Sequence, residues 1–232
     1  MVKALSFNPL ETNCYLISDK GGAVAVVDPG CYYEREAAAL EEAIESAGLH
    51  PVAVILTHGH PDHVYGVARL ARKYGIPVMM SPEDDIILNR GGELVQMFGL
   101  PAVDLGFTIT HVSDGDSVKV GALELKAIGT PGHTPGGLSW YCAEEKLVFS
   151  GDSLFAGAIG RTDLPGGDYD ILMDSLLHKL MVLPEDTLVL PGHGPETTIG
   201  REAATNPFLE PFNEPLKEGF DGIDPITLDG LK

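Results

Sequence analysis

Residues 52–63 read Val-Ala-Val-Ile-Leu-Thr-His-Gly-His-Pro-Asp-His, an apolar run that stops at three histidines and an aspartate. The run from Val52 to Leu56 is typical of a buried β-strand. The chain holds eight histidines in 232 residues, so three of them within six positions is far from an even spread. Imidazole and carboxylate groups together suit zinc, iron and manganese. We interpret this segment as a turn that directs its side chains to two neighbouring metal ions; the alternative is a polar loop that is merely rich in histidine.

Three later segments repeat the design, in which a β-like run ends at glycine or proline and then presents one ligand-type residue. They present His133 after Thr-Pro-Gly, Asp152 after Ser-Gly, and His193 after Pro-Gly. Glycine permits the sharp turn, and proline stops further sheet pairing. One such segment is a weak signal, but three of them after the first turn predict a single converging site. The other histidines are interpreted as ordinary surface or helix residues: His50, His111 and His178.

In this order and spacing the motifs resemble the metallo-β-lactamase superfamily, and within it the short glyoxalase II-like (hydroxyacylglutathione hydrolase-like) metallohydrolases. The matching strings are Thr57-His-Gly-His-Pro-Asp-His63, Thr130-Pro-Gly-His-Thr-Pro-Gly136, Ser150-Gly-Asp152 and Pro191-Gly-His-Gly194. The likeness runs from about residue 5 to about residue 209, and residues 151–163 and 194–200 are similar to the bacterial branch in particular.

The resemblance implies a dinuclear metal centre with two divalent ions per chain. It places the first ion on His58, His60 and His133. It places the second on Asp62, His63 and His193, with Asp152 as a bridge between the two. Zinc is the expected metal, and iron or manganese would suit the same ligands. The penicillin-degrading branch of the superfamily commonly has a cysteine where this chain has Asp152, which argues against a β-lactamase.

The chemistry of such a centre follows from its residues. Imidazoles bring no negative charge, so Asp62 and Asp152 would supply it. Two ions about 3.5–4 Å apart lower the pKa of a shared water from ~16 toward ~7, which gives a hydroxide nucleophile at neutral pH. The ions also polarise a carbonyl and stabilise the oxyanion. Asp62 can orient the hydroxide and accept its proton. We therefore predict a metal-dependent hydrolase in which Asp62 is a catalytic residue.

The resemblance implies an acyl thioester or a related small molecule as substrate. Full-length glyoxalase II enzymes carry a longer carboxy-terminal helical region with basic residues that bind glutathione. Here 39 residues follow His193, and Lys217 is the sole Lys or Arg between Pro207 and Lys232. The hydrolytic residues are thus matched, whereas the glutathione-binding part is not, and S-lactoylglutathione remains one candidate among thioesters.

Arg161 lies in the string Gly160-Arg-Thr-Asp163, nine residues after Asp152. It can bind a substrate carboxylate through a bidentate contact. Alternatively, it pairs with Asp163 or Asp168 and stiffens its loop.

Two other classes of function stay open. A mononuclear iron persulfide dioxygenase of the same superfamily would hold one iron on His58, His133 and Asp152, and members of that branch also have a Gly-Arg-Thr-Asp string. A non-catalytic metal-binding or scaffold protein is the second alternative, although all seven ligand positions carry ligand-type residues.

Composition limits the partners of the chain. Its formal charge of −19 disfavours nucleic-acid binding, which needs clusters of Lys and Arg. Its three cysteines, Cys14, Cys31 and Cys142, form no Cys-x-x-Cys pair, so we expect no disulfide. We find neither a signal peptide nor the ~20 apolar residues of a membrane span, which predicts a cytoplasmic protein without membrane contact. The sequence does not indicate an oligomeric state.

The element pattern predicts a mixed α/β (α+β) fold in one domain over residues 1–232, with 207–232 as a carboxy-terminal extension. Among the features that define this pattern are a hairpin (14–18 and 23–28), helices at 34–47, 64–74, 170–180 and 198–204, and mainly β structure from 108 to 150. Residues 89–107 are rich in glycine and ambiguous. Several architectures would fit, and the resemblance selects the αββα sandwich of the metallo-β-lactamase fold.

Overall fold

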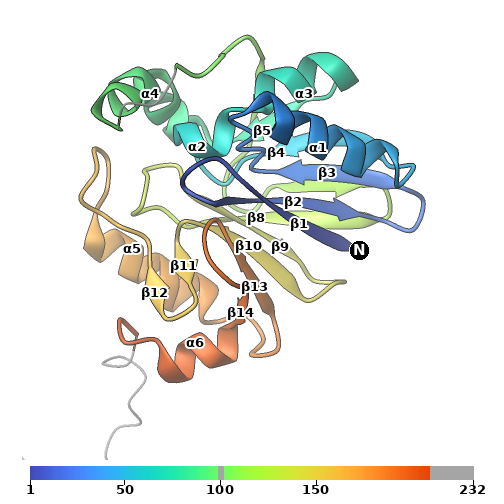
Figure 1. Ribbon diagram of the computed structural model, residues 1–232. Helices are drawn as coiled ribbons and strands as arrows, with labels where there is room; N and C mark the ends of the chain where they lie inside the picture. Colours follow the sequence, from blue (N-terminus) through green and yellow to red (C-terminus); the bar gives the residue numbers. More distant parts are fainter. Residues whose placement is uncertain (99–101, 210–232) are drawn as a thin grey trace, which may run out of the picture.

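The computed structural model describes residues 1–98 and 102–209, in which two β-sheets pack face to face with helices on their outer sides (Figure 1). This confirms the predicted αββα sandwich. The interpretation of residues 207–232 as an extension falls almost entirely outside the described residues.

The first sheet contains six strands among the described residues. In order of pairing they are β1 (Val2–Phe7), β2 (Thr12–Ser18), β3 (Ala23–Val27), β4 (His50–Ile55), β5 (Val78–Met80) and β6 (Ile109–His111). Strands β1 to β3 are antiparallel, and of these the hairpin pattern predicts the β2–β3 pair; β3 to β6 are parallel.

The second sheet also has six strands in the described part of the chain. In order of pairing they are β14 (Thr197–Thr198), β13 (Leu188–Pro191), β10 (Leu147–Gly151), β9 (Leu138–Cys142), β8 (Leu123–Gly129) and β7 (Ser117–Val120). β10 and β13 are parallel, and the other pairs are antiparallel. A separate hairpin, β11 (Leu154–Phe155) with β12 (Ala158–Ile159), follows β10.

Alternation along the strands explains the layers. On β2, Tyr15 and Ile17 pack between the sheets, whereas Cys14 and Leu16 pack under the helices of the first sheet. A strand buried on both faces needs such an unbroken apolar run. A hydrogen bond connects the two sheets: the indole Nε1 of Trp140 on β9 donates to the carbonyl oxygen of Leu56, which follows β4, at 3.0 Å.

The helices cover the two outer faces. Over the first sheet lie α1 (Glu34–Glu45), α2 (Pro61–Val64), α3 (Val67–Tyr74), the 3₁₀ turn η1 (Pro82–Asp84) and α4 (Asp85–Phe98). Over the second lie α5 (Tyr169–Ser175), the π-helical turn η2 (Leu176–Leu180) and α6 (Ile199–Thr205). No helix in residues 1–98 and 102–209 is long and apolar enough to cross a membrane.

The structure corrects several expected boundaries. The helix predicted from Val64 to Tyr74 is broken at Gly66, because the Gly66 amide donates to the Pro29 carbonyl oxygen at 2.7 Å and leaves the helical pattern. The ambiguous residues from 89 onward continue α4 as far as Phe98. Strand β1 and the β11–β12 hairpin are not predicted by the sequence, because both are short or weakly patterned.

Candidate metal centre

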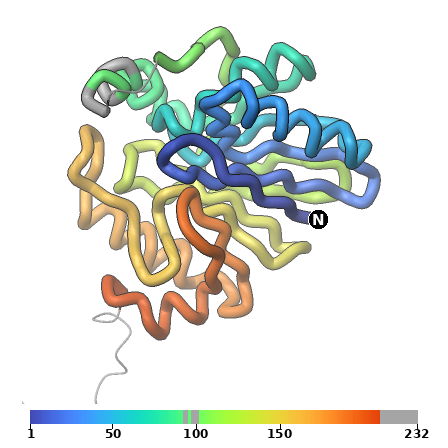
Figure 2. Tube along the Cα trace, in the orientation of Figure 1, coloured from blue at the N-terminus to red at the C-terminus, as the bar shows by residue number. Residues whose placement is uncertain are grey.

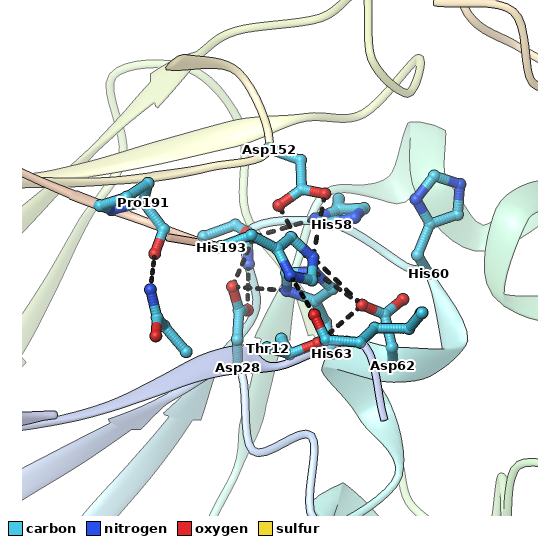
Figure 3. Close-up of polar contacts among 12 residues, drawn as sticks. Thr12, Asp28, His58, His60, Asp62, His63, Asp152, Pro191 and His193 are labelled. Atoms are coloured by element: carbon cyan, nitrogen blue, oxygen red, sulfur yellow. Dashed lines mark hydrogen bonds and ion pairs between the residues drawn. The ribbon is translucent and has the colours of Figure 1, made fainter. Parts of the chain in front are cut away.

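Seven predicted ligands meet at one edge of the sandwich. Figure 3 labels all of them except His133. His58 follows β4, His60 caps α2, and Asp62 and His63 lie within α2. The others follow strands of the second sheet: His133 after β8, Asp152 after β10 and His193 after β13. β8, β10 and β13 run in the same direction, since β8 and β10 are each antiparallel to β9 and β13 is parallel to β10. Their carboxyl ends therefore share one edge.

Glycine lets the strand end at Asp152 reach the centre. Gly151 has a φ of +50°, a region that residues with a side chain rarely adopt. A Cβ at this position would also lie 2.4 Å from the Thr57 Oγ1 atom of the facing loop. The two ligand-bearing loops can thus approach each other only with glycine here.

Asp152 lies between two groups of histidines. Its Oδ2 is 3.6 Å from His133 Nε2 and 3.5 Å from His193 Nε2, and its Oδ1 is 3.5 Å from His63 Nε2. On one side, His60 Nδ1 and His133 Nε2 are 3.0 Å apart. The potential ligand atoms form three groups within 4.8 Å: His58, His60 and His133; His58, His63 and Asp152; and Asp62, His63 and His193. The first and third groups match the two predicted ligand triads.

The donor atoms fit divalent cations. The Nε2 atoms of His58 and His63 and the Oδ1 atom of Asp152 are buried without a hydrogen-bond partner. A buried polar atom left unsatisfied costs about 1–3 kcal/mol. These three residues also form one of the groups whose ligand atoms converge. Coordination of a metal ion would satisfy all three atoms together.

Four of the histidines are oriented through their other ring nitrogen. The Nδ1 atoms contact an oxygen at 2.7–3.0 Å, and the partners are Thr57 Oγ1 for His58, Asp28 Oδ2 for His63, the Arg161 carbonyl for His133 and the Leu10 carbonyl for His193. Metal-binding histidines typically have such partners, which fix the ring and leave the opposite nitrogen for the metal. Each Nε2 therefore points to the centre.

The protonation of His58 and His60 favours ligation. Burial lowers the pKa of His58 well below its ordinary value, and the neighbouring imidazoles add to this effect. Burial and His133 lower the pKa of His60 to about 3. Both rings are neutral at pH 7, the form that binds metal.

The second triad attracts positive charge. Burial alone would lower the pKa of His63, but Asp62, Asp152 and Asp28 raise it to about 9. Burial likewise opposes protonation of His193, yet the two site carboxylates raise its pKa to about 11. Either protons on His63 and His193 or bound metal ions can neutralise the negative charge of these carboxylates. Metal binding at the second triad must therefore displace protons from the two imidazoles.

Asp28 is not among the predicted site residues, although its carboxylate supports the metal centre through Thr57 and His63. Its carboxylate accepts from the Thr57 amide at 2.8 Å, from the Thr57 hydroxyl at 2.6 Å and from His63 Nδ1 at 3.0 Å. The signal was present, because Val26-Val-Asp-Pro-Gly30 has the same design of a strand that ends at an acidic residue followed by proline and glycine. Because this string contains no histidine, it does not by itself indicate a metal site.

The loop between β1 and β2 also contributes in a way that the sequence does not indicate. Thr12 Oγ1 donates to Asp62 Oδ2 at 2.8 Å, and the Leu10 carbonyl orients His193. Thr12 and His193 form an isolated β-bridge, and Figure 2 shows the loop of residues 8–11 beside the segment that follows β13. Leu10 and His193, which are 183 positions apart in the chain, thus share a hydrogen bond.

Asp84 connects two ligand loops without contacting the ligands themselves. Its buried carboxylate accepts from the Gly59 amide at 2.8 Å, between His58 and His60. It also accepts from Thr134 Oγ1 at 2.9 Å and from the Gly136 amide at 2.6 Å, next to His133. The string Ser81-Pro-Glu-Asp84 has the pattern of a helix cap with proline in the first turn. Ser81 does cap η1, but this pattern does not indicate that Asp84 joins the two loops.

A cavity of about 470 Å³ opens over the centre. Arg161 lines it, and its guanidinium forms a bidentate pair with Asp163, with Nε–Oδ1 and Nη2–Oδ2 distances of 2.7 and 2.8 Å. Of the two roles considered for Arg161, the described structure therefore contains the intramolecular pair. Binding of a substrate carboxylate remains a prediction. The complete lining is Leu10, His60, Pro61, Asp62, His133, Asp152, Phe155, Ile159, Arg161, Leu164 and His193.

The three histidines set aside from the sequence lie outside the metal centre, as expected. His178 pairs with Asp174 at an exposed position of η2, and His111 pairs with Asp85 on β6. His50 is exposed at the start of β4. The three cysteines are buried and free.

The model of the family described as "Metallo-beta-lactamase superfamily" matches residues 7–193. The chain belongs to this superfamily. It is 38% identical over 210 residues to the hydroxyacylglutathione hydrolase GloC of Haemophilus influenzae. The aligned region covers 90% of this chain and 97% of GloC. This confirms the superfamily resemblance on which the ligand assignment was based.

Two solved structures are similar to this chain over almost their whole length. The BLEG-1 B3 metallo-β-lactamase has a TM-score of 0.84 and 36% identity, covering 90% of this chain and 99% of that one. TTHA1623 in a di-iron-bound form has a TM-score of 0.79 and 39% identity, and the match covers 89% of this chain and 100% of TTHA1623. This chain has two His-rich groups consistent with a dinuclear centre.

We expect the purified protein to bind two divalent ions per chain. Seven ligand residues are too many for one tetrahedral ion, and Asp152 faces both halves of the cluster. Elemental analysis after reconstitution with excess zinc measures the ratio. His178→Ala, which alters a histidine outside the centre, should give the same ratio, whereas a plateau at one ion would contradict the dinuclear assignment.

Proposed function

We propose that this protein is a metal-dependent hydrolase that cleaves acyl thioesters in the manner of glyoxalase II. The observation that carries the proposal is the position of the seven-residue cluster, because five of its members line a cavity large enough for a small molecule. The likeness to GloC, named a hydroxyacylglutathione hydrolase, supports the thioester class. We propose zinc as the metal, since it suits imidazole-rich sites; iron and manganese suit the same ligands, and TTHA1623 holds two irons.

When bound, the two ions would supply Lewis acidity that activates water and polarises a carbonyl. The protein would hold them through His58, His60 and His133 and through Asp62, His63 and His193, with Asp152 shared.

Asp62 is the residue that we propose to act on the attacking water. Burial opposes its ionisation, but His63 and His193 keep the pKa of Asp62 below its usual range, and the Thr12 hydroxyl holds one of its oxygens. Its carboxylate is therefore an ionised acceptor at pH 7. It can orient the water and accept the proton that the water loses on attack.

The leaving group explains why a thioester suits this site. A thiol has a pKa of about 8.5, so a thiolate departs without a strong general acid. Among the described residues that line the cavity, the ionisable side chains are the cluster itself and Arg161. A thioester therefore suits a site that has no strong general acid to protonate the leaving group.

A mononuclear iron dioxygenase is the second candidate, because His58, His133 and Asp152 come together as two histidines and a carboxylate. Asp152 Oδ2 is 3.6 Å from His133 Nε2, and the His58 and His133 ring centroids are 5.0 Å apart. This reaction would require iron, dioxygen and a thiol persulfide.

We expect the zinc-loaded protein to release thiol from S-lactoylglutathione or from smaller thioesters. The same preparation would be offered a penicillin, because BLEG-1 is named a β-lactamase. Iron-loaded protein would be offered glutathione persulfide while oxygen uptake is recorded. Oxygen uptake without thioester cleavage under either metal would contradict the hydrolase, and penicillin cleavage alone would assign another hydrolytic class.

A further inference from the structure

We propose that the cavity is an acyl pocket that selects apolar aliphatic acyl groups over the hydroxyacyl group of S-lactoylglutathione. This inference rests on the proposed thioesterase function and specifies its substrate class. It starts from the part of the cavity that the metal centre does not use.

Apart from Arg161, the rest of the cavity wall consists of apolar side chains. Phe155 and Ile159 come from the β11–β12 hairpin, Leu164 from the segment that follows it, Pro61 from α2, and Leu10 from the β1–β2 loop. Leu10 is 52% exposed, although the chain carries a formal charge of −19. Five apolar side chains from four segments around one cavity are typical of a site for an apolar ligand.

The hairpin wall is anchored on both sides. Toward the centre, the Gly160 amide donates to the Ser153 carbonyl at 3.1 Å, and a Cβ at Gly160 would lie 1.8 Å from the Asp152 carbonyl oxygen. Away from the centre, the Gly157 amide donates to buried Glu202 at 2.8 Å. The wall is thus held against the ligand Asp152.

Phe155 brings this apolar surface close to the reacting groups. Its ring centroid is 6.3 Å from that of His193. A carbonyl directed at the metal centre would place its acyl group beside Phe155 and Ile159. Burying an aliphatic acyl group there removes apolar area from water, whereas a hydroxyl on the acyl group would lose its hydration against apolar atoms.

The charges around the cavity also disfavour a polyanionic thiol. Glutathione carries two carboxylates, and Arg161 is the sole Lys or Arg that lines the cavity within the described residues. Its guanidinium is already paired with Asp163. The described part of the pocket therefore offers no unpaired Lys or Arg to the glutathione carboxylates, and selection would come from the acyl group.

The direct test is a thioester series on one neutral thiol, N-acetylcysteamine, with acetyl, lactoyl, butyryl and hexanoyl groups. For the zinc-loaded protein, we expect kcat/KM to rise about four-fold per added methylene group. Butyryl should exceed lactoyl, and butyrylglutathione should not exceed its N-acetylcysteamine counterpart. Equal rates, or the highest rate with a lactoyl or glutathione thioester, would overturn the inference while the proposed thioesterase stands.

Binding gives a readout that does not depend on turnover. Calorimetry should show hexanoate binding more tightly than lactate, with a negative heat-capacity change. If no thioester is cleaved, the proposed function fails, and this comparison still decides the preference of the pocket. Tighter binding of lactate would overturn the inference.

The variant for this test is Leu10→Ala. It removes an exposed side chain but keeps the backbone carbonyl that orients His193. We expect the ratio of hexanoyl to acetyl kcat/KM to fall about ten-fold. Val182→Ala shortens another exposed aliphatic side chain, which does not line the cavity, and should leave the ratio unchanged. Equal ratios in wild type and Leu10→Ala would contradict the assignment of Leu10 to the pocket.

Discussion

Replacement of Asp152 by alanine is expected to remove both metal occupancy and turnover. The Asp152 carboxylate contacts His133 on one side of the cluster and His63 and His193 on the other, at 3.5–3.6 Å. Without it, two cations would share a site with less negative charge and no common ligand. Loss of a residue that merely supports a ligand already costs about 10–100-fold, so we expect turnover to fall by at least about 100-fold.

Elemental analysis and thiol release measured on the same preparation would check this prediction. His178→Ala is the control, because His178 pairs with Asp174 on the surface and lies outside the cluster. It should keep both metal and activity. Hydrolysis by Asp152→Ala at the wild-type rate would remove Asp152 from the mechanism.

Replacement of Asp84 by alanine should destabilise the fold and weaken the first metal site more than the second. The change leaves the Gly59 amide, the Gly136 amide and the Thr134 hydroxyl without their acceptor. At about 1 kcal/mol or more for each buried donor, the free energy of unfolding should fall by about 3 kcal/mol. Because these donors flank His58, His60 and His133, the loss should also loosen the first triad.

Glu202→Ala is a matched control for Asp84→Ala. Buried Glu202 also accepts from three groups, the Gly157 amide, Thr197 Oγ1 and Asn206 Nδ2, at 2.6–2.8 Å. Denaturant unfolding should show similar losses of stability in both variants. Chelator competition should show weaker binding of one of the two ions in Asp84→Ala only. Equal metal loss in both variants would mean that Asp84 acts through overall stability.

The site could be predicted largely because its ligands lie at strand ends. His58, His60 and His63 are close in sequence, so a short segment already carries three ligands. His133 and His193 follow strands whose glycine and proline turns are visible in the sequence. Once those strands lie in one sheet in the same direction, their ends must meet. Local pattern thus predicts convergence, and the superfamily resemblance supplies the αββα arrangement.

The supporting residues could not be predicted in this way, because their roles depend on distance in space. Asp84 reads as part of a helix cap, and only the packing of η1 between two ligand loops makes it their common acceptor. Leu10 orients His193 through its backbone carbonyl, and a backbone group has no sequence signature. The β11–β12 hairpin consists of two-residue strands, too short for a periodic pattern.

The sequence by itself determined the chemical type of the centre, since histidine and aspartate at turn positions after apolar runs carry ligand chemistry wherever they are placed. It also determined the alternation that makes β2 and β4 pack on both faces. The tertiary structure alone decided which oxygen orients each imidazole, which carboxylate joins the loops and which apolar side chains face the cavity. The reason is physical: periodicity and turn chemistry act between near neighbours in the chain, whereas hydrogen bonds and cavity walls join residues that only folding brings together.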